Sequence, residues 1–325
     1  MELDLKKINS LLNKIESSNK ICLFVHENPD CDTIGSAFAF KLFIENNFSN
    51  KDVRIAGLSN IDKDYLLPFF DREYVAVDRN FAEQSIGIIF DTSTQSRILS
   101  QLNIFCNWTC LIDHHLSTEE ITNLSIVDSS SSSTCEIVAS IFLNLSKKYK
   151  IDTEIANSLY FGILTDTNRF LYPSVSANTF KIMEWLCNNG LSREEVHNQL
   201  YLNDIQEVEL NHKLFSMVNF NIENHYATLF IDQKYNKKFN QKSFTGKVNL
   251  MANIKNIDIW TLVYYDENLQ KWKGSIRSRE YNVNEIAAKF GGGGHRLASG
   301  FTLKDFKETK ILEMEIKEFL ENVKK

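Results

Sequence analysis

Short apolar runs recur along the first half of the chain, and stretches of helical character separate them. Runs of this length suit strands that are buried on both faces of a parallel sheet. Their alternation with helices predicts an α/β layered domain with a mostly parallel sheet. The runs lie at residues 21–25, 53–57, 74–77, 86–90 and 109–112, and helices are predicted at 34–46, 134–149, 154–164 and 176–188.

The second half of the chain has a different pattern. A polar helical stretch at about 192–217 leads into alternating, strand-like segments from about 219, and a helix is predicted at 284–290. We therefore predict a first domain over 1–190, a helical connector over 191–217 and a smaller α+β domain over 218–325. The chain length of 325 residues suits two domains. No apolar run approaches the roughly 20 residues that a membrane span requires, so no membrane partner is expected.

Charge is distributed unevenly between these regions. Residues 1–233 carry 18 Lys and Arg against 31 Asp and Glu, whereas residues 234–304 carry 13 against 5. The acidic first region fits cation binding, and the basic region fits an anionic substrate such as a nucleotide. The polar N-terminus has no secretory h-region, and the six cysteines form no CxxC pair. A cytoplasmic protein with free thiols is therefore expected.

Acidic and histidine side chains follow the apolar runs. Because ligands bind beyond the carboxyl ends of parallel strands, we expect these side chains to meet at one edge of the sheet. A single Asp after a strand is usually a helix cap, but four such clusters argue for a site. Oxygen ligands with a few imidazoles suit Mn²⁺ or Mg²⁺, and two ions need about six ligands with one bridging carboxylate. The six candidates are His26, Asp30, Asp32, Asp91, His114 and Asp166.

Two further segments are interpreted through their small residues. The serine run at 129–133 is predicted to be a turn that leads into the helix beginning at Thr134. Four consecutive glycines, including Gly293 and Gly294, precede His295, which indicates backbone N–H groups exposed to an anion. Arg277 lies at a nearby strand end, where its planar guanidinium could bind a phosphate.

These segments together resemble a known family. HENPDCDTIGS, DTS, DHH and LTDTNRF resemble the four motifs of the DHH phosphoesterase superfamily, and GSIRSR with FGGGGHRLASG resembles the DHHA1 domain. The two-domain layout is similar to NrnA-type nanoRNases and pAp phosphatases, and to standalone cyclic di-AMP phosphodiesterases. The resemblance implies an α/β DHH domain, a smaller α+β DHHA1 domain and an active site in the cleft between them.

The resemblance also implies a role for each motif residue. His26, Asp30 and Asp91 would hold one Mn²⁺, and Asp91 would bridge to a second ion held with Asp32, His114 and Asp166. Asp113 would support the site, and His115 would face the scissile phosphate. In the DHHA1 domain, the expected substrate-binding residues are Arg277, Ser278, Gly293, Gly294 and His295.

The resemblance leaves the substrate open between two groups. The expected activity is Mn²⁺-dependent hydrolysis of short RNA to mononucleotides, with pAp as a further substrate. The alternative is a cyclic di-AMP or pApA phosphodiesterase, and a homodimer is an open expectation. Asn168 and Arg296 depart from the residues that many relatives carry, glycine and a small residue respectively. Neither is an expected metal ligand, so these departures bear on substrate fit.

Overall fold

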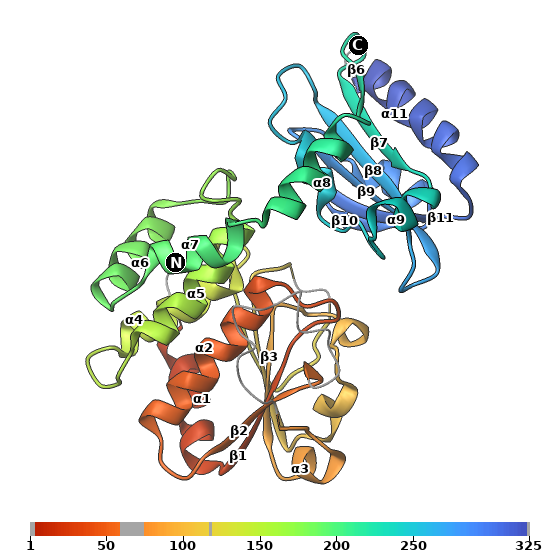
Figure 1. Ribbon diagram of the computed structural model, residues 1–325. Coiled ribbons are helices and arrows are strands. Elements are labelled where there is room, and N and C mark those ends of the chain that lie inside the picture. Colours follow the sequence, from red (N-terminus) through yellow and green to blue (C-terminus); the bar gives the residue numbers. More distant parts are fainter. Residues whose placement is uncertain (1–3, 59–74, 117–118, 324–325) are drawn as a thin grey trace. The chain divides into compact units, whose positions relative to one another are not determined.

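The computed structural model describes residues 4–58, 75–116 and 119–323. The chain divides into two compact units, Met1–Leu202 (unit 1) and Asn203–Lys325 (unit 2), which are drawn in Figure 1. Within the described ranges, no helix combines the length and the apolar character needed to cross a bilayer.

The centre of unit 1 is a five-stranded sheet with the strand order β2-β1-β3-β4-β5. Each neighbouring pair is parallel, which confirms the predicted mostly parallel α/β domain. The chain reverses its direction of winding between β1 and β3, which makes their carboxyl ends the switch point of the sheet. The strands are β1 (Lys20–Phe24), β2 (Asp52–Ala56), β3 (Ile86–Phe90), β4 (Trp108–Asp113) and β5 (Leu124–Val127).

The strand prediction differs from the structure at two places. Residues 75–77 of the predicted strand 74–77 form no strand, and Val75 is 60% exposed, while residue 74 lies outside the described residues. The edge strand β5 was not predicted, because only Ile126 of its four residues is buried and the segment lacks a continuous apolar run. The sheet therefore has five strands, but one is not among the five expected.

Helices cover both faces of this sheet (Figure 1). One core joins α1, α2, α4 and α5 to the sheet, and within it the rings of Phe43 and Phe142 stack with centroids 4.3 Å apart. A smaller core on the other face contains Phe81 of α3 together with Phe24 of β1. The helices are α1 (Leu5–Ser17), α2 (Cys31–Asn47), α3 (Arg79–Glu83), α4 (Thr134–Leu145), α5 (Thr153–Asp166), α6 (Ala177–Asn188) and α7 (Arg193–Tyr201).

Unit 2 is built on a six-stranded sheet with the order β10-β11-β9-β8-β7-β6. Only β7 and β8 pair in parallel, and the other neighbours are antiparallel. This mixed sheet with its helices confirms the predicted α+β class. The strands are β6 (Asn219–Asn221), β7 (Tyr226–Ile231), β8 (Ile259–Asp266), β9 (Lys271–Ser278), β10 (Gly293–His295) and β11 (Ala298–Leu303).

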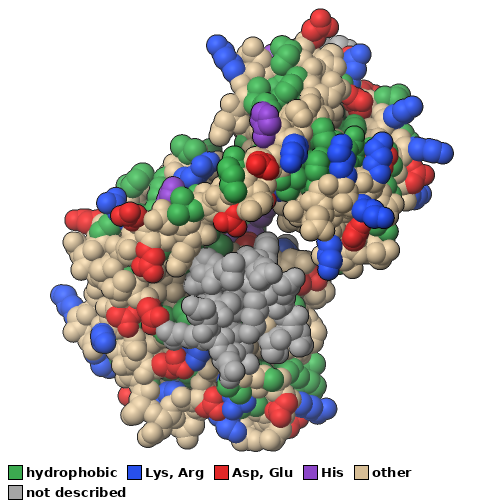
Figure 2. Space-filling view, viewed as in Figure 1, with side chains coloured by type: hydrophobic (Ala, Val, Ile, Leu, Met, Phe, Trp, Pro, Cys, Tyr) green, Lys and Arg blue, Asp and Glu red, His purple; other side chains and the backbone are tan. Residues whose placement is uncertain are grey.

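The helices of unit 2 begin inside the stretch that was predicted as a connector. The boundary between the units falls after Leu202, so the stretch 191–217 contributes α7 to unit 1 and α8 to unit 2. Figure 2 shows Lys and Arg side chains over the visible face of unit 2. Its helices are α8 (Ile205–Phe215), α9 (Lys234–Phe239), α10 (Asn284–Lys289) and α11 (Thr309–Val323), with a 3₁₀ turn, η5 (Lys247–Met251).

Candidate metal centre

Strand ends bring the first group of polar side chains together. His26 follows β1, Asp91 follows β3, and His114 and His115 follow β4, so all four lie at the carboxyl edge of the parallel sheet. Asp91 adopts a left-handed backbone conformation with φ of 62°, which is uncommon outside glycine and asparagine. Such strained residues cluster at functional sites, where the surrounding structure holds them in place.

The first turn of α2 supplies two carboxylates. Asp30 is the N-cap of the helix, and its Oδ1 accepts backbone N–H groups of Asp32 and Thr33 at 3.0 and 3.1 Å. The buried Asp32 carboxylate accepts the backbone N–H groups of Thr134 and Cys135 at 2.7 and 2.8 Å. These donors belong to the first turn of α4, where backbone N–H groups lack helical partners. Two helix starts, about 100 residues apart in sequence, therefore fix Asp32.

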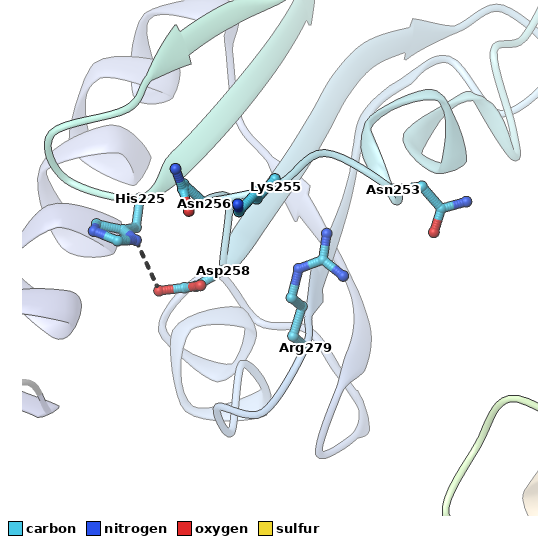
Figure 3. A pocket seen from close by; sticks show the side chains of 6 residues that line it. All are labelled: His225, Asn253, Lys255, Asn256, Asp258 and Arg279. Carbon is cyan, nitrogen blue, oxygen red and sulfur yellow. Dashed lines mark ion pairs between the residues drawn. The ribbon is translucent and has the colours of Figure 1, made fainter.

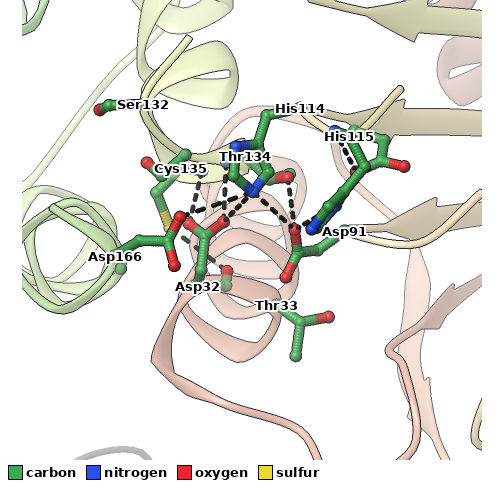
Figure 4. A network of polar contacts seen from close by, with 12 residues as sticks. Asp32, Thr33, Asp91, His114, His115, Ser132, Thr134, Cys135 and Asp166 are labelled. Carbon is green, nitrogen blue, oxygen red and sulfur yellow. Dashed lines mark hydrogen bonds and ion pairs between the residues drawn. The ribbon is translucent and has the colours of Figure 1, made fainter. Parts of the chain in front are cut away.

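The carboxylate of Asp91 lies among three histidines, and its Oδ1 is 3.5 Å from the His115 Nδ1. Its Oδ2 is 3.3 Å from Nε2 of His26, and its Oδ1 is 3.5 Å from Nε2 of His114. The His26 Nε2 also lies 3.7 Å from Asp30 Oδ1. On the other side, His114 Nε2 is 3.5 Å from Asp166 Oδ2, as Figure 4 shows. Asp91 thus presents one oxygen to each of two neighbouring groups.

The donor atoms fit two divalent cations that share one carboxylate. His26, Asp30 and Asp91 form one group, and Asp32, His114 and Asp166 form a second, with the potential ligand atoms of each within 4.8 Å of one another. The resemblance implied Asp91 as a ligand in both sets; here Asp91 is a member of the first group and of a third one with His114 and His115. Mixed carboxylate and imidazole donors suit Mn²⁺ and similar ions.

The electrostatics of the cluster favour a bound cation. Burial, followed by the nearby carboxylates of Asp91 and Asp166, raises the pKa of Asp32 well above its ordinary value. Asp166 keeps 34% of its side chain exposed, yet burial and the charge of Asp91 raise its pKa to about 8. Burial and like charges both disfavour ionised carboxylates, and a cation between them would reverse that effect.

The pKa values of His26 and His114 are shifted in opposite directions. The His26 Nδ1 lies 2.8 Å from the Glu27 carbonyl oxygen and donates to it, which leaves Nε2 facing the carboxylates. Burial alone would lower the pKa of His26, but hydrogen bonds to Asp30 and Asp91 outweigh burial and raise it to about 10. Burial lowers the pKa of His114, which favours the neutral imidazole, the form that binds metal.

The hydrogen bonds of the Asp113 side chain go to His115 and not to a predicted metal ligand. Its Oδ1 accepts the backbone N–H of His115 at 3.0 Å and lies 2.8 Å from the ring Nδ1. Its Oδ2 is buried and has no hydrogen-bond partner among the described residues. Burial would lower the pKa of His115, but the hydrogen bond to Asp113 outweighs it and raises that pKa. His115 also forms a third potential ligand group, with Asp91 and His114.

Sequence reasoning missed one hydroxyl in this cluster. The Thr134 hydroxyl donates to Asp91 Oδ1 at 3.0 Å (Figure 4). The serine run before it forms the predicted turn, and the Ser133 side chain caps α4 by accepting the N–H of Glu136. The sequence signal was therefore only that of a helix start, and nothing in it indicated that this start reaches Asp91.

The predicted substrate residues of unit 2 lie at one end of its sheet. Ala298 of β11 pairs with Arg277 of β9 on one side and with His295 of β10 on the other, so the three share one row. Arg277 Nη1 donates to the carbonyl oxygens of Ile276 and Ser299 at 2.9 and 3.2 Å. These hydrogen bonds position the guanidinium of Arg277 in the row that also carries His295.

Ser278 and the two glycines have local structural roles. The buried Ser278 hydroxyl accepts the backbone N–H groups of Glu280 and Tyr281 at 3.2 and 2.8 Å, so it shapes the turn after β9. Gly294 has a φ of 145°, and a Cβ there would lie 2.7 Å from the Ala298 carbonyl oxygen. Gly293 is exposed, and a Cβ would have only a distant contact at 3.9 Å. Close backbone approach thus explains Gly294 but not Gly293.

The fold and these motifs define a family. Residues 20–163 match the model of the DHH family, N-terminal domain, and residues 223–325 match that of the DHHA1 domain. The chain belongs to the DHH family, which confirms the resemblance noted from its motifs.

Individual relatives are similar to this chain over nearly its whole length. The uncharacterized protein MG371 of Mycoplasma genitalium is 38% identical, with 98% of each chain covered. The bifunctional oligoribonuclease and PAP phosphatase NrnA of Bacillus subtilis is 30% identical, over 92% of this chain and 94% of that one. Among solved structures, an exopolyphosphatase-related protein from Bacteroides fragilis has the same fold, with a TM-score of 0.84, 22% identity and 99% of each chain covered.

Proposed function

We propose that this chain hydrolyses short oligoribonucleotides to mononucleotides with the help of two divalent metal ions, and that pAp is a further substrate. Its membership of the DHH family makes it a phosphoric ester hydrolase. The observation that carries the proposal is the Asp91 carboxylate, whose two oxygens face two separate groups of ligands. The substrate is supported by relatives named oligoribonuclease and PAP phosphatase NrnA.

His26, Asp30, Asp32, His114 and Asp166 would hold the ions together with the bridging Asp91. When bound, such ions acidify water and neutralise charge on phosphoryl oxygens. Mn²⁺ is the ion we propose, because carboxylate and imidazole donors occur together in both groups.

The remaining chemistry falls to side chains of this chain. His115, oriented by Asp113, is proposed to donate a hydrogen bond to a non-bridging oxygen of the scissile phosphate as negative charge grows there. The raised pKa of His115 keeps its ring protonated over a wider pH range, which suits a donor. In this scheme Asp113 fixes the orientation of the imidazole.

Substrate recognition is assigned to unit 2. Arg277 and His295 are proposed to bind a phosphate of the terminal nucleotide, since both lie in one row of the sheet. Gly293, Gly294 and Ser278 would shape the backbone around that nucleotide. A cytoplasmic location, a homodimer and an active site that draws on both units stay predictions from the sequence.

A side-by-side time course tests the proposed function. Purified protein with Mn²⁺ is incubated with a 5′-phosphorylated RNA trimer, pAp and cyclic di-AMP, and the products are separated by chromatography. Mononucleotides from the trimer, with cyclic di-AMP left intact, are the expected result. Opening of cyclic di-AMP as the fastest reaction would replace the proposal with the cyclic dinucleotide alternative. No turnover of any substrate would refute both.

A further inference from the structure

The two faces of the unit 2 sheet are covered to different extents. On one face a buried cluster extends across the sheet to β9 and β11, where Ile276 and Phe301 are members, and residues of α10 and α11 complete it. On the other face the buried cluster takes its strand residues from β7 and β8 only, such as Leu229 and Leu262. Within the described residues, the part of this face formed by β9, β11 and β10 contains no buried side chain.

Cationic side chains occupy that uncovered part. Lys271, Lys273 and Arg277 alternate along β9 with residues that point to the covered face, where Gly274 and Ile276 are buried. Side chains two residues apart on a strand share a face. Same-face neighbours lie roughly 6.6 Å apart along the strand, a spacing comparable to that of phosphates along an extended single strand.

Arg279 continues this row past the end of β9. Its guanidinium carbon lies 5.8 Å from the centre of the Trp260 ring, and Trp260 is the residue directly opposite Arg277. Arg279 therefore lies on the same face as Arg277. We call the side chains of Lys271, Lys273, Arg277 and Arg279 the β9 basic stripe.

The neighbouring strand leaves the stripe uncovered. The residues of β11 opposite Arg277, Ser275 and Lys273 are Ala298, Gly300 and Thr302. All three are small, and Gly300 and Thr302 are exposed. The ion pairs formed between described residues of unit 2 include neither Lys271 nor Lys273. On β8 the residue directly opposite Lys271 is the carboxylate Asp266, and the residue opposite Lys273 is Tyr264. Lys273 is therefore the lysine with no carboxylate beside it in the ladder.

The Arg279 end of the stripe borders a pocket of about 490 Å³. Arg279 donates to the backbone carbonyl oxygens of Ala252, Ile254 and Ile257, and so holds the loop that carries Lys255. Figure 3 shows Lys255 and Arg279 lining this pocket. Asp258, its one carboxylate, is 3.3 Å from the His225 ring. The pocket therefore adds a further cation, Lys255, at the end of the stripe.

We infer that the β9 basic stripe binds the phosphate backbone of a single-stranded oligoribonucleotide beyond the terminal nucleotide. This inference rests on the proposed function and adds to it a track that favours substrates several nucleotides long. The charge of the stripe complements a polyanion, and Ser275 separates its cations into two pairs, Lys271 with Lys273 and Arg277 with Arg279. Lys271 and Lys273 lie outside every motif used to identify the terminal nucleotide site, so their effect should depend on RNA length.

Binding of fluorescently labelled RNA tests the inference without any need for catalysis. The full chain is stripped of metal with EDTA, and affinities for a dinucleotide and a heptanucleotide are measured over a range of salt concentrations. The Lys271→Ala, Lys273→Ala double variant should bind the heptanucleotide about tenfold more weakly at 0.1 M salt. Its logarithmic salt slope should be shallower by about 1.4, because each lost phosphate contact contributes about 0.7 for single strands. Its affinity for the dinucleotide should change less than about twofold.

Matched variants distinguish RNA binding by the β9 basic stripe from a general effect of positive charge on the protein. Lys310→Ala with Lys317→Ala removes two charges from α11, which packs on the covered face, and should leave both affinities unchanged. Replacing Lys271 and Lys273 by arginine should preserve heptanucleotide binding. Equal losses for both RNA lengths, an unchanged salt slope, or equally strong displacement of the RNA by polyglutamate would overturn the inference.

The two proposals fail in distinguishable ways. Length-dependent binding without any cleavage in Mn²⁺ would refute the proposed hydrolysis and keep the stripe. Cleavage of the trimer by wild type, with heptanucleotide binding unaffected in the double variant, would refute the stripe and keep the hydrolase.

Discussion

At the scale of single residues, Asp91 has the most demanding position. It combines a left-handed backbone, a hydrogen bond from Thr134 and a separate histidine facing each carboxylate oxygen. A residue in this position cannot be replaced by one with a single acceptor oxygen without disturbing both ligand groups. Asp91→Asn keeps the shape of the side chain but removes its charge.

We expect Asp91→Asn to bind less than one metal ion per chain and to lose at least about a thousandfold in kcat, since both groups lose their common ligand. Metal content after dialysis and kcat on an RNA trimer measure this. Asp152→Asn is the matched control, because Asp152 caps α5 and asparagine serves equally well as a cap. Full activity of Asp91→Asn would contradict the shared-ligand arrangement.

The hydrogen bonds of the Asp113 side chain go to His115, so replacing Asp113 should separate the orientation of His115 from metal binding. We expect Asp113→Asn to retain both ions while kcat falls about 10- to 100-fold, as is usual when a group that orients a functional histidine is changed. The acidic limb of the pH–rate profile should move as well, because the hydrogen bond that raises the pKa of His115 is weakened. Loss of metal in this variant would show that Asp113 supports the ligands instead.

At the scale of elements, the site depends on how closely α5 approaches α2. Gly162 of α5 makes this possible, since a Cβ at that position would lie 2.7 Å from Asp32 Oδ1 and 2.3 Å from the Cys135 sulfur. The extra methyl group would therefore push α5 away from both α2 and α4. Asp166, at the end of α5, would move with it.

Gly162→Ala should lower the free energy of unfolding by about 1–3 kcal/mol, the range for overpacking a core. It should also weaken metal binding. Denaturant unfolding and a metal titration measure the two effects. Gly246→Ala is an informative comparison, because Gly246 has a φ of 82° but no neighbour within 4 Å, so backbone strain should lower its stability without altering metal affinity. Equal metal affinity in wild type and Gly162→Ala would show that the site tolerates a shift of α5.

Local sequence patterns predicted some elements and not others. The strands β1, β3 and β4 are continuous apolar runs buried in a parallel sheet, so their composition alone indicated them. The edge strand β5 has one buried residue of four and carries no such signal. The contact of Thr134 with Asp91 depends on tertiary packing between segments 43 residues apart, which no local pattern contains.

One departure from the family pattern has a backbone explanation. Asn168, where many relatives were expected to carry glycine, has a φ of 46° and begins a run of three left-handed residues after α5. Asparagine tolerates this conformation better than most residues, so it can replace glycine there. The candidate ligands His26, Asp91 and His114 were accessible to sequence reasoning because they follow strands, whereas the β9 basic stripe emerged only once the strand register was known.

At the scale of the whole molecule, protons that Asp166 and His26 retain in the folded protein link the free energy of unfolding to metal binding. Asp166 has a folded pKa of about 8 against an ordinary value of 3.8, so between these pH values the folded, metal-free protein retains a proton that the unfolded chain releases. The contribution of Asp166 to the free energy of unfolding should therefore fall as pH rises from about 4 to 8. His26, raised from 6.5 to about 10, acts in the same direction at higher pH.

Mn²⁺ should reverse this trend, because it replaces the retained protons. We expect the rise in Tm on adding Mn²⁺ to be small near pH 5 and to grow towards pH 8. Differential scanning calorimetry with EDTA or Mn²⁺ at several pH values measures the difference. A rise in Tm on adding Mn²⁺ that does not depend on pH would show that the ions do not displace protons from these side chains.

The shared Asp91 carboxylate has a consequence for how metal occupancy responds to metal concentration. An ion that binds in one group fixes the position of Asp91 for the other, so the second ion meets a ligand that is already ordered. Occupancy should then rise more steeply than a single-site isotherm, with few singly loaded molecules. Under the proposed function, activity would then change from low to full over a narrow range of Mn²⁺ concentration.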